Sequence, residues 1–405
     1  MRVIIINDFA YINGGAGKIA LATAKTLAEK NIEVIFFTGV GPIDNSLKLI
    51  KNLRTICLNQ HDILTDESRL RAMIQGVWNK YALKKLREVL LELDTKDTII
   101  HIHTCQKALS SSCVSIAIKM GFKVVYHVHD YGLVCPNLGF YNYKKQQVCN
   151  ERALSFSCIV SNCDSRCYLH KFWRCIRQWV QNQWGLMPRK IENYIFVSNF
   201  SFFILERFLP QNSQKYFLDN PIDISPQECV AINKNDMIIF IGRLSKEKNP
   251  ILLARATRDL NMSTVFIGAG DCEDKIKEIN PKAVITGWLS KDEMEIYIKK
   301  ARALVLPSSC YETQGLVVNE VAAYGIPSIV SDVSAAKDFV EDRENGLIFE
   351  NNNLDSLKIK LQELFDDKFA ENLGRNSYNK FYSKNFSINL YIEKLIKIYQ
   401  EILEK

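Results

Sequence analysis

The sequence predicts an α/β protein with two domains, each built on a parallel β-sheet. The chain has 405 residues, which is too long for one ordinary core and suits two domains of roughly 200 residues each. Short apolar runs rich in β-branched residues alternate with longer amphipathic stretches, which is the pattern of βα units that build parallel sheets. This pattern restarts in the second half, so we expect one such domain on either side of residue 220.

The first half contains five predicted strands and three predicted helices. The strands are Val3–Ile6, Val34–Phe37, Thr98–His103, Val124–His129 and Tyr194–Val197. The helices are Ile19–Lys30, Leu70–Leu93 and Ser110–Met120. The glycine-rich segment at 13–18 does not predict a P-loop, because the earlier glycine is missing and Ile19 replaces the required Ser or Thr.

The second half repeats the alternation with five predicted strands, Met237–Ile241, Val265–Ile267, Val284–Thr286, Leu304–Leu306 and Ser328–Val330. Ser290 and Glu293 form a capping-box pattern that predicts the start of a helix. A turn-type sequence at 220–223 places the boundary there, which predicts domains of 1–220 and 221–380. The segment 381–405 is predicted to hold a final helix that packs back toward the first domain. Ligands of such folds bind beyond the carboxyl ends of the strands, so we expect a site in a central cleft between the domains.

The composition is that of a globular protein, with 47% hydrophobic and 24% charged residues. The first apolar run is interrupted at Asn7 and Asp8, too early for a signal peptide, and no uncharged apolar run reaches the roughly 18 residues of a membrane span. We therefore expect a cytoplasmic location. The net charge of +7 fits an anionic ligand or an anionic membrane surface, and no nucleic-acid-binding motif accompanies it.

Two basic side chains follow the first strand of the second half. Gly242 lets the chain turn, and Arg243 and Lys248 can then reach one anionic group. Arginine offers two parallel donors to phosphate oxygens and lysine a point charge. A solvated surface loop is the alternative. Gly268 begins a Gly-Ala-Gly turn that lacks the third glycine of a dinucleotide fingerprint, so we interpret it as a tight turn beneath a ligand.

The segment 308–320 carries the strongest functional pattern. Its glycine and apolar run predict a helix that begins near Gly315 or Leu316, and the free N–H groups of such a helix favour an anion such as diphosphate. Glu312 precedes this helix and Glu320 lies within it, so the two carboxylates can bind hydroxyl groups at opposite ends of one extended ligand. The alternative is one carboxylate favoured by the helix dipole and one exposed helix glutamate.

These motifs resemble those of glycosyltransferase family 4, whose members have the two-domain GT-B fold. Glu312 and Glu320, with seven residues between them and a central Gly-Leu, look like the family's paired-glutamate signature. The Gly-Arg-x4-Lys loop and the segments 267–270, 286–289 and 323–328 match further family motifs in the same order. The resemblance covers nearly all of the second half, and it is to bacterial surface-polysaccharide glycosyltransferases.

The resemblance implies a role for each matching residue. Arg243 and Lys248 would bind the donor diphosphate and stabilise its charge as it leaves. Glu312 would contact the transferred sugar, and Glu320 the ribose hydroxyls. Such enzymes retain the anomeric configuration and usually need no metal. The implied donor-binding set is completed by Gly15, Gly242, Gly268, Gly287, Trp288, Gly315 and Leu316.

Histidines end two predicted strands of the first half. His127 and His129 lie on one face of their strand, and His101 and His103 offer a similar pair. His129 matches the family's histidine near the reaction centre, which would hydrogen-bond the sugar or the acceptor. A structural role is the alternative for a histidine at a strand end.

The segment 135–175 is rich in cysteine and lacks clear periodicity. Cys135, Cys149, Cys163 and Cys167 are candidates for a tetrahedral structural zinc site that holds this long loop together. Their spacing is looser than that of paired C-x2-C motifs, so ordinary buried thiols are the alternative. The segment 171–190 interleaves basic and aromatic residues, which predicts either contact with an anionic membrane surface or an ordinary helix with a basic face.

The family resemblance implies a retaining hexosyltransferase that uses a UDP- or GDP-linked sugar donor and needs no cofactor for catalysis. Its expected acceptor is a glycan or a polyprenyl-linked glycan in polysaccharide biosynthesis, met at the inner face of the membrane. Nucleic acid is not an expected partner. A nucleotide-sugar epimerase of the same fold and a non-catalytic nucleotide-sugar binder are the alternatives.

Overall fold

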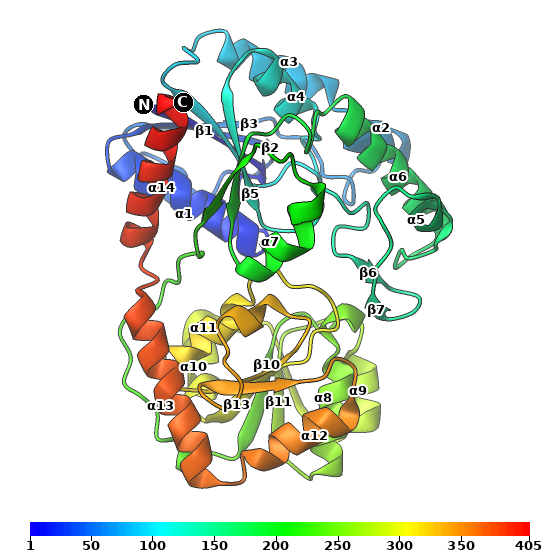
Figure 1. Cartoon of the computed structure of the whole chain (residues 1–405), viewed down its shortest axis with the longest axis vertical. Coiled ribbons are helices and arrows are strands. Elements are labelled where there is room, and N and C mark those ends of the chain that lie inside the picture. The colour runs from blue at the N-terminus through cyan, green and yellow to red at the C-terminus, as the bar shows by residue number, and fades with distance from the viewer. The chain divides into compact units, whose positions relative to one another are not determined.

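The computed structural model describes residues 1–405, and the chain folds into two compact units (Figure 1). The first unit comprises Met1–Gly139, Glu151–Pro221 and Ser387–Lys405. The second unit comprises Phe140–Asn150 and Ile222–Phe386. Each unit contains one parallel sheet with its own buried apolar core, as the sequence predicts for an α/β protein with two domains.

The sheet of the first unit has seven parallel strands. In spatial order these are β3 (Leu53–Cys57), β2 (Glu33–Val40), β1 (Arg2–Phe9), β4 (Thr98–Ile102), β5 (Lys123–Val128), β8 (Asn193–Phe196) and β9 (Gln214–Phe217). The central strands β1 and β4 are buried along nearly their whole length, because both faces of a parallel sheet are covered by helices. The five predicted strands are confirmed. The two edge strands were missed, since both are partly exposed and neither has a long apolar run.

Eight helices belong to the first unit: α1 (Gly15–Glu29), α2 (Arg69–Val77), α3 (Lys80–Leu90), α4 (Ser112–Lys119), α5 (Phe156–Val160), α6 (Tyr168–Gln183), α7 (Asn199–Leu205) and α14 (Ile388–Glu404). The prediction of one helix over Leu70–Leu93 is wrong. Buried Asn79 separates α2 from α3, because its side chain accepts from Ala82 N at 2.9 Å and donates to Ala108 O at 2.8 Å. An N-cap of this kind begins a new helix.

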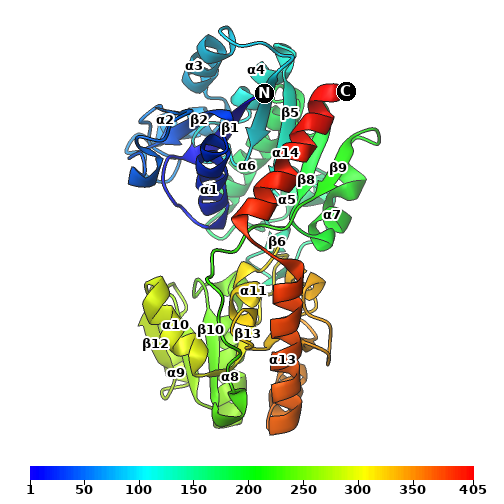
Figure 2. The same ribbon diagram turned by 90° about the vertical axis from the view of Figure 1, so that its left-hand side faces the viewer.

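The C-terminal helix α14 lies beside α1 in both views (Figures 1 and 2). Ile392, Leu395 and Tyr399 are fully buried against the sheet and α1. Burial of each such side chain stabilises a fold by about 1.5–3 kcal/mol. The Tyr399 hydroxyl also lies 2.6 Å from His101 Nδ1, which connects the last helix to β4.

The sheet of the second unit has six parallel strands. In spatial order these are β12 (Val284–Gly287), β11 (Thr264–Ile267), β10 (Met237–Ile241), β13 (Ala301–Leu306), β14 (Ser328–Ser331) and β15 (Gly346–Phe349). This is the order of a doubly wound sheet, in which the winding direction reverses between β10 and β13. The five predicted strands are again confirmed, and only the edge strand β15 was missed.

Six helices pack on this second sheet: α8 (Pro250–Asp259), α9 (Glu273–Ile279), α10 (Lys291–Lys299), α11 (Leu316–Ala322), α12 (Leu354–Glu363) and α13 (Asp367–Lys384). The predicted capping box is confirmed at α10, where Ser290 and Glu293 each accept a hydrogen bond from the other's backbone N–H. The predicted start of a helix after Gly315 is confirmed at α11.

A short hairpin of β6 (Tyr141–Asn142) and β7 (Gln147–Val148) belongs to the second unit, although it lies within the first half of the sequence. The Tyr141 hydroxyl lies 3.1 Å from Ser309 Oγ, and Asn352 Nδ2 donates to Gln146 O at 3.3 Å. The sequence-based boundary assigned all residues up to 220 to the first domain. Strands of two residues are too short to show a periodic pattern, so the sequence does not predict that residues 140–150 belong to the second unit.

Asp8 organises the segment that follows β4. Its buried carboxylate accepts the backbone N–H groups of Lys107, Ala108 and Leu109 at 2.8 to 2.9 Å. Its own N–H donates to Thr104 Oγ1 at 3.1 Å. One side chain at the end of β1 therefore satisfies three backbone donors that would otherwise be buried without partners.

We predict that Asp8→Ala lowers the free energy of unfolding by about 2–4 kcal/mol, because three backbone donors lose a charged acceptor. Asp94→Ala is the matched control, since the Asp94 carboxylate also accepts a backbone N–H, that of Lys96, but at an exposed position. Urea denaturation of both variants measures the two costs. Equal losses of stability would contradict the role given to Asp8.

Candidate functional site

The reversal of strand order in the second sheet places two loops side by side. The loop after β10 carries Gly242, Arg243 and Lys248, and the loop after β13 carries Ser308 and Glu312. Because β10 and β13 are parallel neighbours, both loops leave the same edge of the sheet. Ligands of doubly wound sheets bind at this position.

Glycines allow the loops after β10, β11 and β12 to pack backbone against backbone. Gly242 N donates to Ile267 O at 3.0 Å, and Gly268 N donates to Gly287 O at 2.9 Å. A Cβ atom on Gly268 would lie 2.0 Å from the carbonyl oxygen of Gly242, and its φ of +140° favours glycine as well. The three predicted glycines therefore let these loops pack closely at one edge of the sheet.

Lys248 and Glu312 form an ion pair across the two loops, with Nζ 2.8 Å from Oε1. Their side chains are only 22% and 12% exposed, so water screens the pair weakly. Ser308 Oγ donates a further hydrogen bond to Glu312. Burial alone would raise the pKa of Glu312, but the Lys248 ammonium and these hydrogen bonds hold that pKa below its ordinary value. Glu312 is therefore a carboxylate at neutral pH, and Lys248 an ammonium whose pKa the carboxylate raises against the effect of burial.

Arg243 is the exposed cation of the site. Its side chain is 67% exposed and lies 3.5 Å from Glu247 Oε1, which also accepts from Ser245 Oγ at 2.8 Å. Only the Arg243 end of this pair faces solvent, because the Glu247 side chain is 11% exposed. Glu247 also fastens the two loops together, because its backbone oxygen accepts from Ser309 N at 2.9 Å. The backbone of the Arg243 loop is thus held in place by this hydrogen bond, whereas the exposed Arg243 guanidinium is accessible to an anion.

Helix α11 begins at the same edge of the sheet. Gly315 is its N-cap with φ +76°, and a Cβ there would lie 3.0 Å from the Ala336 side chain. Leu316 is the first helical residue, and Glu320 is a partly exposed residue one turn further along. Trp288, directly after β12, is 63% exposed. The predicted donor-binding residues of the second unit therefore lie at or after the carboxyl ends of β10, β11, β12 and β13, with Glu320 furthest along, in α11.

The arrangement suits a ligand that carries both phosphate and hydroxyl groups. Two cations, Arg243 and Lys248, offer charge-assisted donors to phosphate oxygens. The Glu312 carboxylate is ionised and adjacent, and accepts hydrogen bonds from hydroxyl groups. The geometry brings Arg243, Lys248 and Glu312 into one site, as the sequence predicts.

His129 and Gly15 are predicted site residues that belong to the first unit. Gly15 is the exposed first residue of α1, after β1. His129 follows β5 and is partly exposed, with Nε2 2.9 Å from His103 Nδ1. Burial lowers the pKa of His129 to about 3, so its ring is neutral at physiological pH. A neutral imidazole exchanges hydrogen bonds but supplies no charge.

The predicted zinc-binding cysteines are spread over different environments. Cys135 and Cys163 are buried and Cys167 is exposed, whereas Cys149 belongs to the hairpin segment of the second unit. Buried Lys171 has the predicted Cys163 beside it together with two other cysteines. Its Nζ lies 3.4 Å from Cys158 Sγ, and Cys158 is hydrogen-bonded to Cys175. The zinc site of four cysteines stays a prediction.

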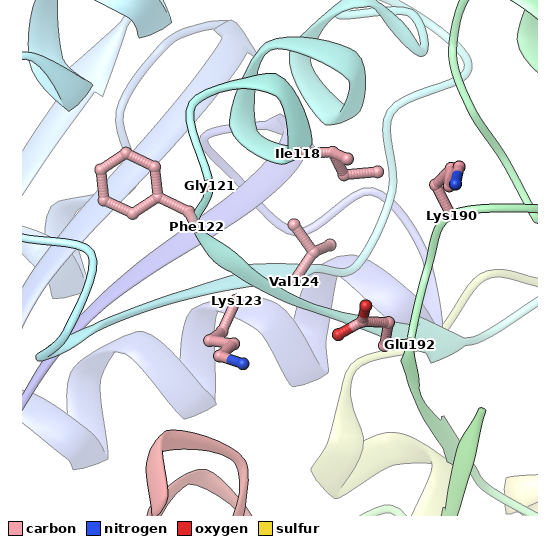
Figure 3. A pocket seen from close by; sticks show the side chains of 7 residues that line it. All are labelled: Ile118, Gly121, Phe122, Lys123, Val124, Lys190 and Glu192. Carbon is pink, nitrogen blue, oxygen red and sulfur yellow. The ribbon is translucent and has the colours of Figure 1, made fainter. Parts of the chain in front are cut away.

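A pocket of roughly 200 Å³ lies elsewhere in the first unit (Figure 3). It is lined by Ile118, Gly121, Phe122, Lys123, Val124, Lys190 and Glu192. Lys123 begins β5 and Glu192 precedes β8, so the pocket lies at the amino ends of these strands. Ligands of parallel sheets bind at the opposite ends, and we assign the pocket no role.

Three residues of the candidate site did not follow from the sequence. Ser308 and Glu247 hold the predicted residues in place, and Tyr141 contacts the loop after β13 from the hairpin. The pKa of Tyr141 is raised to about 12, chiefly by burial, so its hydroxyl stays protonated. Ser308 and Glu247 lie within loops that the sequence already predicts to form the site, so their position in these loops could have indicated them. No local sequence pattern indicates Tyr141.

Comparison with known proteins agrees with this geometry. Residues 223–380 match the family described as glycosyl transferases group 1. An uncharacterised glycosyltransferase of Methanocaldococcus jannaschii is 31% identical over 170 residues, covering 40% of this chain and 48% of that protein. The Escherichia coli UDP-Gal:α-D-GlcNAc-diphosphoundecaprenol α-1,3-galactosyltransferase is 25% identical over 192 residues, covering 44% of this chain and 49% of that protein. The matches thus span about half the length of these relatives.

Among solved structures, HepE of Anabaena in complex with UDP and glucose has a TM-score of 0.68 and 14% sequence identity. The match covers 99% of this chain and 100% of HepE, so it extends over both units. At this identity the likeness establishes the fold. The chain therefore has the GT-B fold of two Rossmann-like units, and its residues 223–380 are similar to the glycosyl transferases group 1 family.

Proposed function

We propose that the protein is a retaining glycosyltransferase that moves a hexose-type unit from a nucleotide-sugar donor to a glycan acceptor. The Lys248–Glu312 ion pair, with Arg243 on the neighbouring loop, carries this proposal. Two cations suited to binding phosphate lie beside an ionised carboxylate, at the edge of the sheet where ligands of doubly wound folds bind, and residues 223–380 match the group 1 family. The family 4 assignment rests on the spacing of Glu312 and Glu320.

In the proposed reaction, the bond between the anomeric carbon and the donor diphosphate breaks, and negative charge develops on the diphosphate. A bond from the acceptor's hydroxyl oxygen to the anomeric carbon forms on the same face of the sugar. Arg243 and Lys248 stabilise that charge as it forms. Glu312 accepts hydrogen bonds from the transferred sugar, and Glu320 from the ribose. The departing phosphate accepts the acceptor's proton, so no separate base is required. His129, neutral at physiological pH, serves as a hydrogen-bonding residue toward the sugar or the acceptor.

A uridine diphosphate donor is the first choice, and a guanosine diphosphate donor the second. The solved HepE structure holds UDP and glucose, and the name of the E. coli relative specifies UDP-galactose. Exposed Trp288 offers a flat surface on which either base can stack. An epimerase of the same fold is less favoured, because the named relatives are transferases.

The proposed acceptor is carried on a polyprenyl diphosphate lipid, as in the names of two relatives. No helix of the protein combines the length and the apolar character that a membrane span requires. Helix α6 instead presents an exposed apolar stripe at helical spacing, formed by Leu169, Phe172, Ile176 and Trp179. The neighbouring helix α2 adds exposed Leu70, Met73 and Ile74. Apolar patches of this kind mark interaction surfaces.

Positive charge flanks this apolar surface. Arg166, Arg189 and Lys190 are exposed beside the ends of α6. Each such residue adds about 1 kcal/mol of attraction to an anionic leaflet. We therefore propose that α2 and α6 rest on the cytoplasmic face of an anionic membrane, where a lipid-linked acceptor is found.

Nucleotide-sugar binding is expected to raise the thermal midpoint of the protein. A panel of UDP-, GDP- and ADP-sugars at 100 times the dissociation constant should stabilise the second unit by about 2.7 kcal/mol for the true donor. Arg243→Ala should weaken that donor roughly 10- to 100-fold, because a charge-assisted hydrogen bond is lost. Arg375→Ala, which removes a similarly exposed guanidinium paired with Glu371, is the control and should bind normally. No response to any nucleotide sugar would contradict the proposal.

Stability should reveal the Lys248–Glu312 coupling. Lys248→Met is expected to lower the free energy of unfolding at pH 7 by about 1–3 kcal/mol, since a weakly hydrated carboxylate loses its partner. Because the folded-state pKa of Glu312 is depressed, the stability it contributes is present above its unfolded pKa and is lost as pH falls below it. The cost of Lys248→Met should therefore shrink toward pH 4.

A double-mutant cycle tests this coupling. Lys248→Met combined with Glu312→Gln should cost less than the sum of the two single changes. The exposed pair of Lys275 and Glu278 supplies a control cycle, whose coupling should stay below about 1 kcal/mol. Additive effects at Lys248 and Glu312 would show that the two side chains do not share an ion pair.

Membrane contact should depend on the apolar stripe of α6. Sedimentation with vesicles that contain anionic phospholipid should bring down the wild-type protein, and Phe172→Ser with Trp179→Ser should leave it in the supernatant. The matched control exchanges Ile359 and Phe365, two comparably exposed apolar residues of the second unit, for serine. Equal sedimentation of both double variants, or none of the wild type, would rule out this surface.

A further inference from the structure

Three histidines lie together in the core of the first unit. His101 is in β4, His103 directly follows β4, and His127 is in the adjacent strand β5. All three are at most 1% exposed. Their ring centroids are 4.2 to 5.3 Å apart. A group of three polar rings in an apolar sheet core is uncommon, because each ring nitrogen there needs a partner.

Several of these ring nitrogens have no hydrogen-bond partner. They are Nε2 of His101, Nε2 of His103, and both nitrogens of His127. A buried polar atom without a partner costs about 1–3 kcal/mol, and native proteins contain few of them. Four such nitrogen atoms in one cluster indicate that a shared ligand could bind them.

The remaining ring nitrogens are held from outside the cluster. His101 Nδ1 lies 2.6 Å from the Tyr399 hydroxyl of α14, and His103 Nδ1 lies 2.9 Å from His129 Nε2. Hydrogen bonds of this kind fix the tautomer and the orientation of metal-binding histidines, and leave the other nitrogen to the metal. The available nitrogens of His101 and His103 are thus both Nε2.

The spacing suits one metal ion. One nitrogen from each of the three rings lies within 4.8 Å of those of the other two. Tetrahedral zinc with imidazole nitrogens at about 2.0–2.1 Å requires nitrogens roughly 3.4 Å apart. Metal binding therefore requires side-chain rotations that bring the nitrogens up to about 1.4 Å closer together. Burial lowers the pKa of all three rings, so they have the neutral form that binds metals.

We propose that His101, His103 and His127 bind one divalent zinc ion that joins β4 to β5 within the first unit. Imidazole nitrogens suit zinc, as they suit copper, iron and nickel, whereas magnesium and calcium prefer oxygen ligands. Through Tyr399 and His129 the same ion would also fix the positions of α14 and of the residue proposed to face the sugar. The site is separate from the four-cysteine zinc site predicted from the sequence, with which it shares no residue.

The test is the metal content of the full-length chain produced in zinc-supplemented medium and dialysed against a weak chelator. We expect one zinc per chain in the wild type and less than one tenth of that in His127→Gln and His101→Gln. His61→Gln and His170→Gln are the matched controls, since these are the two exposed histidines outside the cluster, and both should retain the metal. Cys163→Ser should retain it as well.

Two readouts keep the proposal testable if the histidine variants fold poorly. Cobalt(II) in the wild-type protein should give a tetrahedral visible spectrum without the thiolate charge-transfer band that cysteine ligands produce. Removal of the metal with a strong chelator should lower the thermal midpoint of the wild type. Absence of metal from the wild type, a thiolate band, or loss of metal only in Cys163→Ser would overturn the proposal. None of these results depends on glycosyltransferase activity or on the donor.

Discussion

The adjacency of β10 and β13 is the constraint on which the candidate site depends. These strands are consecutive neighbours in the sheet, although 59 residues separate the end of one from the start of the other. Their loops carry Lys248 and Glu312, which meet only because the two strands pair in parallel. The hydrogen bond from Ser309 N to Glu247 O then holds the loops at a fixed separation. The Lys248–Glu312 ion pair therefore depends on the strand order of the sheet, and not on a local feature of either loop.

Charge and close packing support each other at this edge of the sheet. Glycines at 242, 268 and 287 bring the first three loops into backbone contact, and the Lys248 side chain at this edge is only 22% exposed. Weak hydration strengthens the attraction of Lys248 to an anion, and the Glu312 carboxylate offsets the cost of burying that cation. Arg243 differs because it is exposed, and can therefore turn toward a phosphate at small cost.

The sequence predicted those parts of the fold and the site that follow from local chemistry. β10 was located to the residue because it is a run of five consecutive apolar residues, of which the central three are buried. Arg243, Lys248 and Glu312 were found because they follow such strands. The break at Asn79, the position of Tyr141 and the gathering of His101 with His127 all depend on partners distant in the sequence, and no periodicity encodes them.

The most direct measurement is an experimental structure of the protein with bound UDP. The account predicts diphosphate oxygens within hydrogen-bonding distance of Arg243 and Lys248, and the ribose against Glu320 at the first turns of α11. Binding of UDP at another place, such as the pocket at the amino ends of β5 and β8, would contradict it.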